Sequence, residues 1–340
     1  MVCHFLAQRI CSILMANPVH PVYLLDCFMP HLIRLLTRES ALALTQAKLV
    51  KTALEQAQPG FTVELHPTKS LGDKYRDRWE ELARGDRAEL TKRKWTFELE
   101  EAIAHGEADL AVHSAKDLPL DVRSDTALLP VLPREDERDV FIGKHTRFAA
   151  LPQGACIGTD SKRRRAQLLR LRPDVRVVPH DGNVPTRLAK LEASDSLDGI
   201  VLAAAGLARL NLTPPWLEFF APEAFVPAAH QGILAAQHHV GNVWLATLLQ
   251  RLADARTHAV WLAERAAVVT LQADCETAIG AWARVEGANL HLLVRGLSPN
   301  GSRWIEERAT APLDEAEQLG QRVAETLLQR GIQDVLRYNT

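Results

Sequence analysis

A short polar turn in the first half of the chain carries residue types that could hold charge and move protons. An apolar, strand-like run at 108–112 leads into Ser114, Lys116 and Asp117, and Pro119 ends the run. Ligands of open α/β sheets bind just beyond the carboxyl ends of strands. The run therefore places a hydroxyl, an ammonium and a carboxylate where chemistry is usually done. Taken alone, such a segment is more often a solvated turn with a local Lys-Asp pair.

Four further stretches supply cations, a hydroxyl and a thiol in a fixed order along the chain. They are TRESALAL at 37–44, GNVPTRL at 182–188, AGLARL at 205–210 and CETAIG at 275–280. With the turn HSAKDLP at 113–119, they resemble the motifs of the hydroxymethylbilane synthase family, also called porphobilinogen deaminase. One such motif would be weak, whereas several in the family's order, from residue 33 to the C-terminus, are specific.

Alternating strand-like and helix-like segments predict an α/β fold. We expect one α/β domain over 31–132 plus 231–250 and a second over 137–226, with a cleft between them. Residues 255–340 read as a small α+β domain with an antiparallel sheet, because turn residues separate its alternating segments. The family resemblance implies that the two α/β domains are of the periplasmic-binding-protein type (type II).

The resemblance also implies an activity. The family joins porphobilinogen units head to tail, with loss of ammonia, into the linear tetrapyrrole hydroxymethylbilane, on a dipyrromethane cofactor attached covalently through a cysteine, here Cys275. Asp117 matches the catalytic carboxylate, which would hold the substrate ammonium and shuttle protons. For the cofactor the resemblance implies Cys275, Lys116, Ser114, Thr159, Asp160, Ser161, Arg163, Arg164, Gly182 and Asn183. For the substrate it implies Arg38, Ser40, Arg187, Arg209 and Lys92.

Charge at one expected helix start points independently to an anion. The stretch 159–161 can cap a helix whose first turn then holds four cations at 162–165. The helix dipole disfavours each cation there by about 0.3 to 1 kcal/mol, and a bound anion would reverse that effect. A solvated basic helix start is the alternative.

Some positions depart from the family pattern. Asp181 stands where the family has an arginine, and we expect it to repel an anionic ligand unless it is turned away or paired with Arg187. The stretch 91–95 lacks the family's glycines, and His230 replaces a glycine in a hinge-like turn. These departures keep a second hypothesis open: a non-catalytic or weakly active paralogue that binds a small anionic ligand in the interdomain cleft.

Composition limits the remaining choices. The 340 residues are 47% hydrophobic and 24% charged, with a formal net charge of -2. These values are typical of a soluble globular protein and give no global attraction to nucleic acid. We therefore expect no nucleic-acid partner and, by family resemblance, a monomer. Apart from the pair His238 and His239, the 13 histidines show no ligand spacing for a metal, and we expect that pair on the surface.

Cysteines and the N-terminal segment bear on location. The five cysteines show no paired spacing, which favours neither disulfides nor zinc and fits a cytoplasmic protein. Residues 1–30 have no apolar run of about 18 to 20 residues and no signal-peptide pattern. We expect an extra, poorly ordered arm, or a start codon assigned too early, and no membrane partner.

Overall fold

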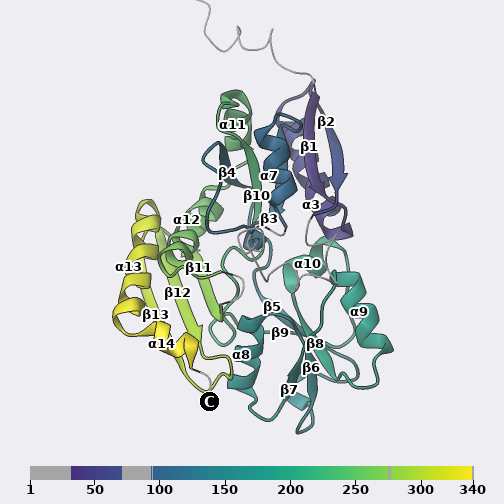
Figure 1. Ribbon diagram of the computed structural model, residues 1–340, viewed down its shortest axis with the longest axis vertical. Helices are drawn as coiled ribbons and strands as arrows, with labels where there is room; N and C mark the ends of the chain where they lie inside the picture. Colours follow the sequence, from purple (N-terminus) through teal and green to yellow (C-terminus); the bar gives the residue numbers. More distant parts are fainter. Residues whose placement is uncertain (1–31, 71–92, 94, 275–276, 339–340) are drawn as a thin grey trace, which may run out of the picture.

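The computed structural model describes residues 32–70, 93, 95–274 and 277–338 (Figure 1). Three separate sheets organise this part of the chain, and helices pack against each of them. The expected arm at 1–30, Lys92 and Cys275 lie outside the described residues.

The first sheet contains strands from two distant parts of the sequence. Its elements are β1 (Leu32–Arg38), α3 (Ala41–Ala57), β2 (Thr62–Thr68), α7 (Phe97–Ala104), β3 (Leu110–Ser114), β4 (Thr126–Val131), β10 (Leu234–His239) and α11 (Val243–Gln250). The strand order is β2-β1-β3-β10-β4. β1 is parallel to β2 and β3, whereas β10 is antiparallel to both of its neighbours, β3 and β4. The expected mostly parallel sheet is thus confirmed, with β10 as the reversed strand.

Helix α3 shows how local sequence sets an element that borders the site. Ser40 caps it, because its hydroxyl oxygen accepts a hydrogen bond from the Ala43 N–H at 3.3 Å. Val50 and Leu54 are fully buried against the first sheet. The helix stops before Gly60, whose φ of +98° continues the chain in a conformation that glycine adopts freely.

The second sheet repeats this design. Its elements are β5 (Asp139–Gly143), η4 (Phe148–Ala150), β6 (Cys156–Gly158), α8 (Lys162–Leu171), β7 (Arg176–Val178), α9 (Val184–Ala193), β8 (Gly199–Ala203), α10 (Ala204–Arg209) and β9 (Leu217–Phe219). The strand order is β7-β6-β8-β5-β9, and β5 runs antiparallel to β8 and β9. Phe220 and Phe225 stack with ring centroids 4.4 Å apart in its core.

The third sheet is antiparallel, with strand order β11-β12-β13. Its region contains α12 (Ala255–Thr270), β11 (Ile279–Glu286), β12 (Asn289–Leu297), β13 (Trp304–Pro312), η5 (Leu313–Glu315), α13 (Ala316–Gln329) and α14 (Ile332–Arg337). The expected turn glycines, Gly287 and Gly301, have φ of +60° and +70°. Leu319, Val323 and Leu327 lie on the buried face of α13, as the spacing predicts. In Figure 1, α12 and α13 cover one face of this sheet.

The chain passes between the first two sheets twice. We call residues 132–138, between β4 and β5, the first crossover, and residues 220–233, between β9 and β10, the second crossover. β5 and β10, the reversed strands, are the ones that follow the crossovers. We retain the domain bounds 31–132 with 231–250, 137–226 and 255–340 as a proposal.

Two sequence expectations concern histidines and helices. The surface position expected for His238 is wrong, because this residue is 5% exposed in the centre of the first sheet, on β10. Across the described part of the chain, no helix has both the length and the apolar character of a membrane span. Among the same residues, no three His, Cys, Asp or Glu side chains gather as a metal site.

Candidate active site

The turn singled out in the sequence follows β3 directly. A single 3-10 turn, η3 (Ala115–Asp117), carries Lys116 and Asp117. The Asp117 side chain is exposed, whereas Lys116 is partly buried and donates from Nζ to Gln231 Oε1 at 3.2 Å. The pKa of Lys116 falls from 10.5 to about 8, because burial removes water and Arg164 repels the ammonium. A bound anion would stabilise the ammonium form of Lys116 in these surroundings.

Asp139, the first residue of β5, is a buried counterion that sequence reasoning missed. Arg163 Nη1 donates to its Oδ2 at 2.7 Å, and Arg164 donates to its Oδ1 from Nε at 2.9 Å and from Nη2 at 2.7 Å. The Gln231 side-chain amide also donates to Oδ1, at 3.1 Å. These two arginines hold the pKa of Asp139 well below its ordinary value despite complete burial. One carboxylate for two guanidiniums leaves the cluster with an excess of positive charge.

The start of α8 therefore differs from the sequence expectation in one respect. Ser161 is the N-cap, accepting from the Arg164 N–H at 3.3 Å, as expected. Of the four cations in the first turn, however, Arg163 and Arg164 turn inward to Asp139, so the protein supplies part of the negative charge itself. Only the excess charge is left for a ligand.

Arg187, on α9, interacts electrostatically with the same cluster. Its Nε donates to Gly182 O at 2.7 Å. Burial lowers the pKa of Arg187, and Arg164 lowers it further, although Asp160, Asp181 and Asp117 oppose the shift. The charges of Asp117 and Lys116, from the first sheet, and of Arg164 and Arg187, from the second, are thus close enough to influence one another.

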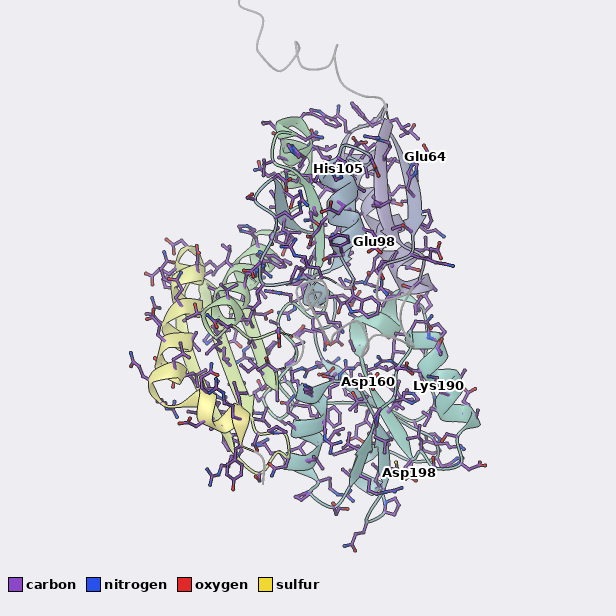
Figure 2. The ribbon with its side chains drawn as sticks, in the orientation of Figure 1. Glu64, Glu98, His105, Asp160, Lys190 and Asp198 are labelled. Atoms are coloured by element: carbon purple, nitrogen blue, oxygen red, sulfur yellow. The ribbon has the colours of Figure 1, made fainter. Side chains whose placement is uncertain are left out.

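Other expected cofactor residues shape the loops around this cluster. Thr159 Oγ1 accepts from the Ser161 N–H at 3.2 Å, and Asp160 Oδ1 accepts from the His180 N–H at 2.9 Å. Asn183 caps α9 by accepting from the Thr186 N–H at 2.9 Å. Figure 2 labels Asp160 in the part of the molecule that carries β6 and α8. The side chains of Thr159, Asp160 and Asn183 thus order the loops that lead into α8 and α9, the helices that carry the candidate arginines.

The Asp181 carboxylate accepts a hydrogen bond from Lys190 Nζ, and both side chains are about half exposed. Its negative charge also acts on Arg187, where it opposes the lowering of the arginine pKa. Lys190 lies two turns along α9, and Figure 2 shows it on the outer side of that helix. The acid that stands in place of a family arginine therefore has its charge offset locally, which weakens the main reason for the non-catalytic hypothesis.

Arg38 and Arg209 come from different parts of the fold: Arg38 ends β1 of the first sheet, and Arg209 ends α10, which follows β8 of the second sheet. Arg38, the last residue of β1, lies with its guanidinium carbon 4.1 Å from the centroid of the Trp95 ring. Arg209 Nη2 donates to Gly232 O at 2.6 Å, next to the Gln231 that binds Lys116. Burial lowers the pKa of Arg209 to about 10. The structure thus brings the described candidate arginines to the ends of strands and to the second crossover.

Sequence reasoning missed four side chains at this site. Gln46 holds the Ser114 hydroxyl, with its Nε2 and Oε1 at 2.8 and 3.0 Å from Oγ. Gln231 bridges Lys116 to Asp139, and Trp95 lies against Arg38. For Asp139, one signal was available: an acid that opens the apolar strand 139–143 must be paired if that strand is buried.

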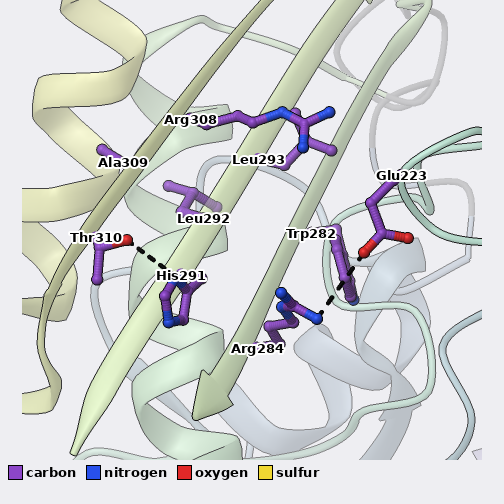
Figure 3. A pocket seen from close by; sticks show the side chains of 9 residues that line it. All are labelled: Glu223, Trp282, Arg284, His291, Leu292, Leu293, Arg308, Ala309 and Thr310. Atoms are coloured by element: carbon purple, nitrogen blue, oxygen red, sulfur yellow. Dashed lines mark hydrogen bonds and ion pairs between the residues drawn. The ribbon is translucent and has the colours of Figure 1, made fainter.

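A separate hollow of about 170 Å³ lies on the outer face of the third sheet (Figure 3). Trp282, Arg284, His291 and Arg308 line it together with Glu223 from the second crossover. Arg284 pairs with Glu286 at 3.0 Å and lies 3.9 Å from Glu223, so its charge is already offset. No candidate site residue lines this hollow.

Comparisons with known proteins cover nearly the whole described chain. The family described as "Porphobilinogen deaminase, dipyromethane cofactor binding domain" matches residues 33–264, and "Porphobilinogen deaminase, C-terminal domain" matches residues 259–329. The porphobilinogen deaminase of Alkaliphilus metalliredigens (strain QYMF) is 35% identical over 305 residues, which is 89% of this chain and 94% of that protein.

Solved structures give weaker likenesses. CbnR, a LysR family transcriptional regulator, is 12% identical over 66% of this chain and 70% of its own, with a TM-score of 0.39. The probable amino-acid ABC transporter extracellular-binding protein ytmK of Bacillus subtilis is 6% identical over 65% and 89%, with a TM-score of 0.38. Such scores say nothing about function. The family matches and the 35% identity to the Alkaliphilus protein do, and they show that this chain belongs to the porphobilinogen deaminase family.

Proposed function

We propose that this protein is a hydroxymethylbilane synthase. It condenses porphobilinogen head to tail, releases one ammonia per unit joined, and gives the linear tetrapyrrole hydroxymethylbilane. The structural observation that carries the proposal is the exposed carboxylate of Asp117 among partly or fully buried cations whose pKa values are lowered. Such a site suits a substrate that carries both an ammonium and carboxylates.

Asp117 is the proposed catalytic residue. Its carboxylate binds the aminomethyl ammonium of porphobilinogen and stabilises the positive charge that develops at the methylene carbon as ammonia leaves. The same carboxylate accepts the proton that the attacked pyrrole ring must lose. Because Asp117 lies on a short turn anchored by the Ala115 N–H to Ile233 O bond at 3.0 Å, it is held in place without being buried.

The arginines are proposed to bind carboxylates. Each porphobilinogen unit carries an acetate and a propionate, and a guanidinium binds a carboxylate through two parallel hydrogen bonds. Arg187 donates from Nε to Gly182 O and Arg209 donates from one Nη to Gly232 O, while their remaining N–H groups have no hydrogen-bond partner among the described residues. We assign Arg38, Arg187 and Arg209 to substrate, and Ser40 to the ordering of the helix behind them.

The residues present also fit the dipyrromethane cofactor named by the family description. The surroundings of Lys116, Arg187 and Arg209 disfavour the positive charge of these side chains. The carboxylates of a bound polyanionic group would stabilise that charge. When bound, the group supplies the pyrrole carbon to which the first substrate unit is joined. We propose that Lys116, Ser114, Arg163, Arg164 and the loops at 159–161 and 182–183 hold it.

Attachment of the cofactor through the Cys275 thiol is part of the proposal. The residues that flank this cysteine are tied together, because the Thr277 N–H donates to Asp274 O at 3.1 Å and the Thr277 hydroxyl donates to Asp274 Oδ1 at 2.8 Å. We also propose Lys92 as a substrate ligand, and a cytoplasmic monomer that binds neither nucleic acid nor a membrane. Sedimentation of the purified protein tests the oligomeric state.

Intact mass spectrometry tests the central proposal. Protein from cells that make porphobilinogen should weigh more than its sequence by one dipyrromethane, and Cys275→Ser should lose that increment, whereas the matched Cys156→Ser should keep it. Incubation with porphobilinogen should then add further units and consume substrate. An unmodified mass together with no substrate consumption would contradict the assignment and favour the ligand-binding alternative.

A further inference from the structure

His230 occupies an unusual place in the second crossover. Its φ is +62°, a conformation that a histidine rarely adopts, and its side chain is only 3% exposed. The imidazole lies against the Trp261 ring of α12, with centroids 4.3 Å apart. The His230 N–H donates to Glu264 Oε2 at 2.5 Å, also on α12. The crossover is therefore held to the third region of the molecule at this residue.

The surroundings of the imidazole do not suit a positive charge. Its Nε2 is buried and has no hydrogen-bond partner among the described residues. Arg265 from α12 and Arg134 from the first crossover both repel a charged ring. Glu264 is the nearby acid, but both of its carboxylate oxygens already accept hydrogen bonds. Oε1 accepts from Arg134 Nη1 at 2.8 Å, and Oε2 accepts from the His230 backbone N–H. Burial and these arginines place the pKa of His230 well below its ordinary value, although a hydrogen bond to the Trp261 backbone opposes the shift.

The neighbouring residues of the crossover reach the active site. Gln231 receives the Lys116 ammonium at 3.2 Å and donates to Asp139 at 3.1 Å. Gly232 O accepts from Arg209 at 2.6 Å. The position of His230 therefore sets the positions of groups that hold a proposed cofactor ligand and a proposed substrate ligand.

We propose that His230 is a positioning residue and a pH-sensitive latch: its neutral ring, packed on Trp261, holds Gln231 against Lys116, and protonation of the ring releases the second crossover. The effect on turnover rests on the proposed function, whereas the effect on folding does not. Arg134 and Arg265 would both repel a charged ring, which favours movement of the crossover away from them.

The direction of the pH effect follows from comparing the ordinary pKa of histidine with the lowered pKa of His230 in the folded protein. Below the ordinary value of 6.5, the unfolded chain takes up a proton at His230 that the folded protein excludes. Stability from this residue is therefore present above that value and is lost as the pH falls below it. From about pH 8 to about pH 5 the folding equilibrium constant should fall about 30-fold on this account.

Denaturant unfolding of the full chain at both pH values tests the latch. His230→Phe keeps an aromatic ring on Trp261 but cannot titrate. The factor by which its folding equilibrium constant falls between the two pH values should therefore be about 30 times smaller than in the wild type. His230→Gly relieves the positive φ and should also remove that pH dependence. His113, which is buried with a pKa of about 4, contributes equally in every variant and cancels from the comparison. His145→Phe, at an exposed turn, should leave the wild-type pH dependence unchanged.

Activity gives a second readout. Each protein's turnover is compared with its own value at about pH 8, and on lowering the pH the wild type should lose turnover before His230→Phe does. Equal pH dependence of unfolding in the wild type and both variants would overturn the latch, as would an NMR titration of the His230 ring at its ordinary value. Absence of turnover in the wild type at every pH would instead contradict the proposed function and leave the unfolding result to decide on the latch.

Discussion

Lys190 and Asp181 form an ion pair across the start of α9, with Lys190 Nζ donating to both the backbone oxygen and the carboxylate of Asp181. This pair keeps the aspartate from acting as a free negative charge beside Arg187. An acid at a position where the family has an arginine is therefore compatible with binding of an anionic substrate.

Removing Lys190 should impair substrate binding more than folding. Lys190→Met removes the cation that pairs with Asp181 and so adds negative charge near Arg187, so we expect a higher KM for porphobilinogen with little change in kcat. Because the pair is about half exposed, the unfolding free energy should change by less than about 1 kcal/mol. Steady-state kinetics at low salt measures the effect.

The double variant and a matched surface lysine control this prediction. Lys190→Met with Asp181→Asn should restore the wild-type KM, because the double variant removes the negative charge of Asp181 as well. Lys48→Met, on the exposed face of α3, should have no effect. An unchanged KM in Lys190→Met would mean that Asp181 does not face the substrate.

Asp117→Ala should abolish catalysis without unfolding the protein. The side chain is exposed on a turn, and substitutions at such positions usually change stability by less than about 0.5 kcal/mol. Loss of a positioned proton-transfer group should lower kcat by about 10² to 10⁴, and loss of charge stabilisation should lower it further. Asp121→Asn, an exposed acid four residues along the chain, is the matched control. Retained turnover in Asp117→Ala would remove the catalytic role.

Local sequence patterns predicted the elements of the fold because their causes are local. The end of α3 before Gly60 and the buried stripe of α13 each depend on residues within a few positions of one another. The antiparallel turn glycines of the third sheet were predicted for the same reason. The direction of β5 and β10 was not predicted, because it follows from the path of the two crossovers and not from any local pattern.

The site was predicted less completely, since its charge balance depends on distant pairs. Arg163 and its counterion Asp139 are 24 residues apart, and Lys116 and Gln231 are 115 apart. A family motif identifies the cation in each case but not the group that binds it. The same holds for Asp181, whose partner depended on how the loop before α9 turns.

Asp139→Asn should destabilise the protein strongly. The substitution leaves Arg163 and Arg164 buried without a carboxylate, and breaking a buried pair in this way costs about 3 to 5 kcal/mol. In the wild type the lowered pKa of Asp139 contributes stability that is present above its ordinary value of 3.8 and is lost as the pH falls below that value.

Denaturant unfolding at neutral and acidic pH measures both the loss of stability in Asp139→Asn and the pH dependence of stability in the wild type. The Asn variant should be less stable at neutral pH, and the difference from the wild type should narrow as the pH falls. Asp198→Asn serves as a control in the same sheet region, since its carboxylate accepts the Cys156 N–H rather than a buried guanidinium. A variant as stable as the wild type at neutral pH would contradict the proposed charge balance.

Trp95 should act on substrate binding through Arg38. The indole ring lies 4.1 Å from the guanidinium carbon and so limits the orientations of a side chain assigned to a substrate carboxylate. A cation-π contact of this kind is worth about 0.5 to 2 kcal/mol, so Trp95→Leu should raise KM by about 2- to 30-fold. Trp95→Phe should recover most of the affinity, because it keeps a ring face. Trp304→Leu removes a similar contact, with Arg170 at 4.6 Å, on the third sheet and should leave KM unchanged. Equal KM values for Trp95→Leu and Trp304→Leu would show that the ring does not position Arg38.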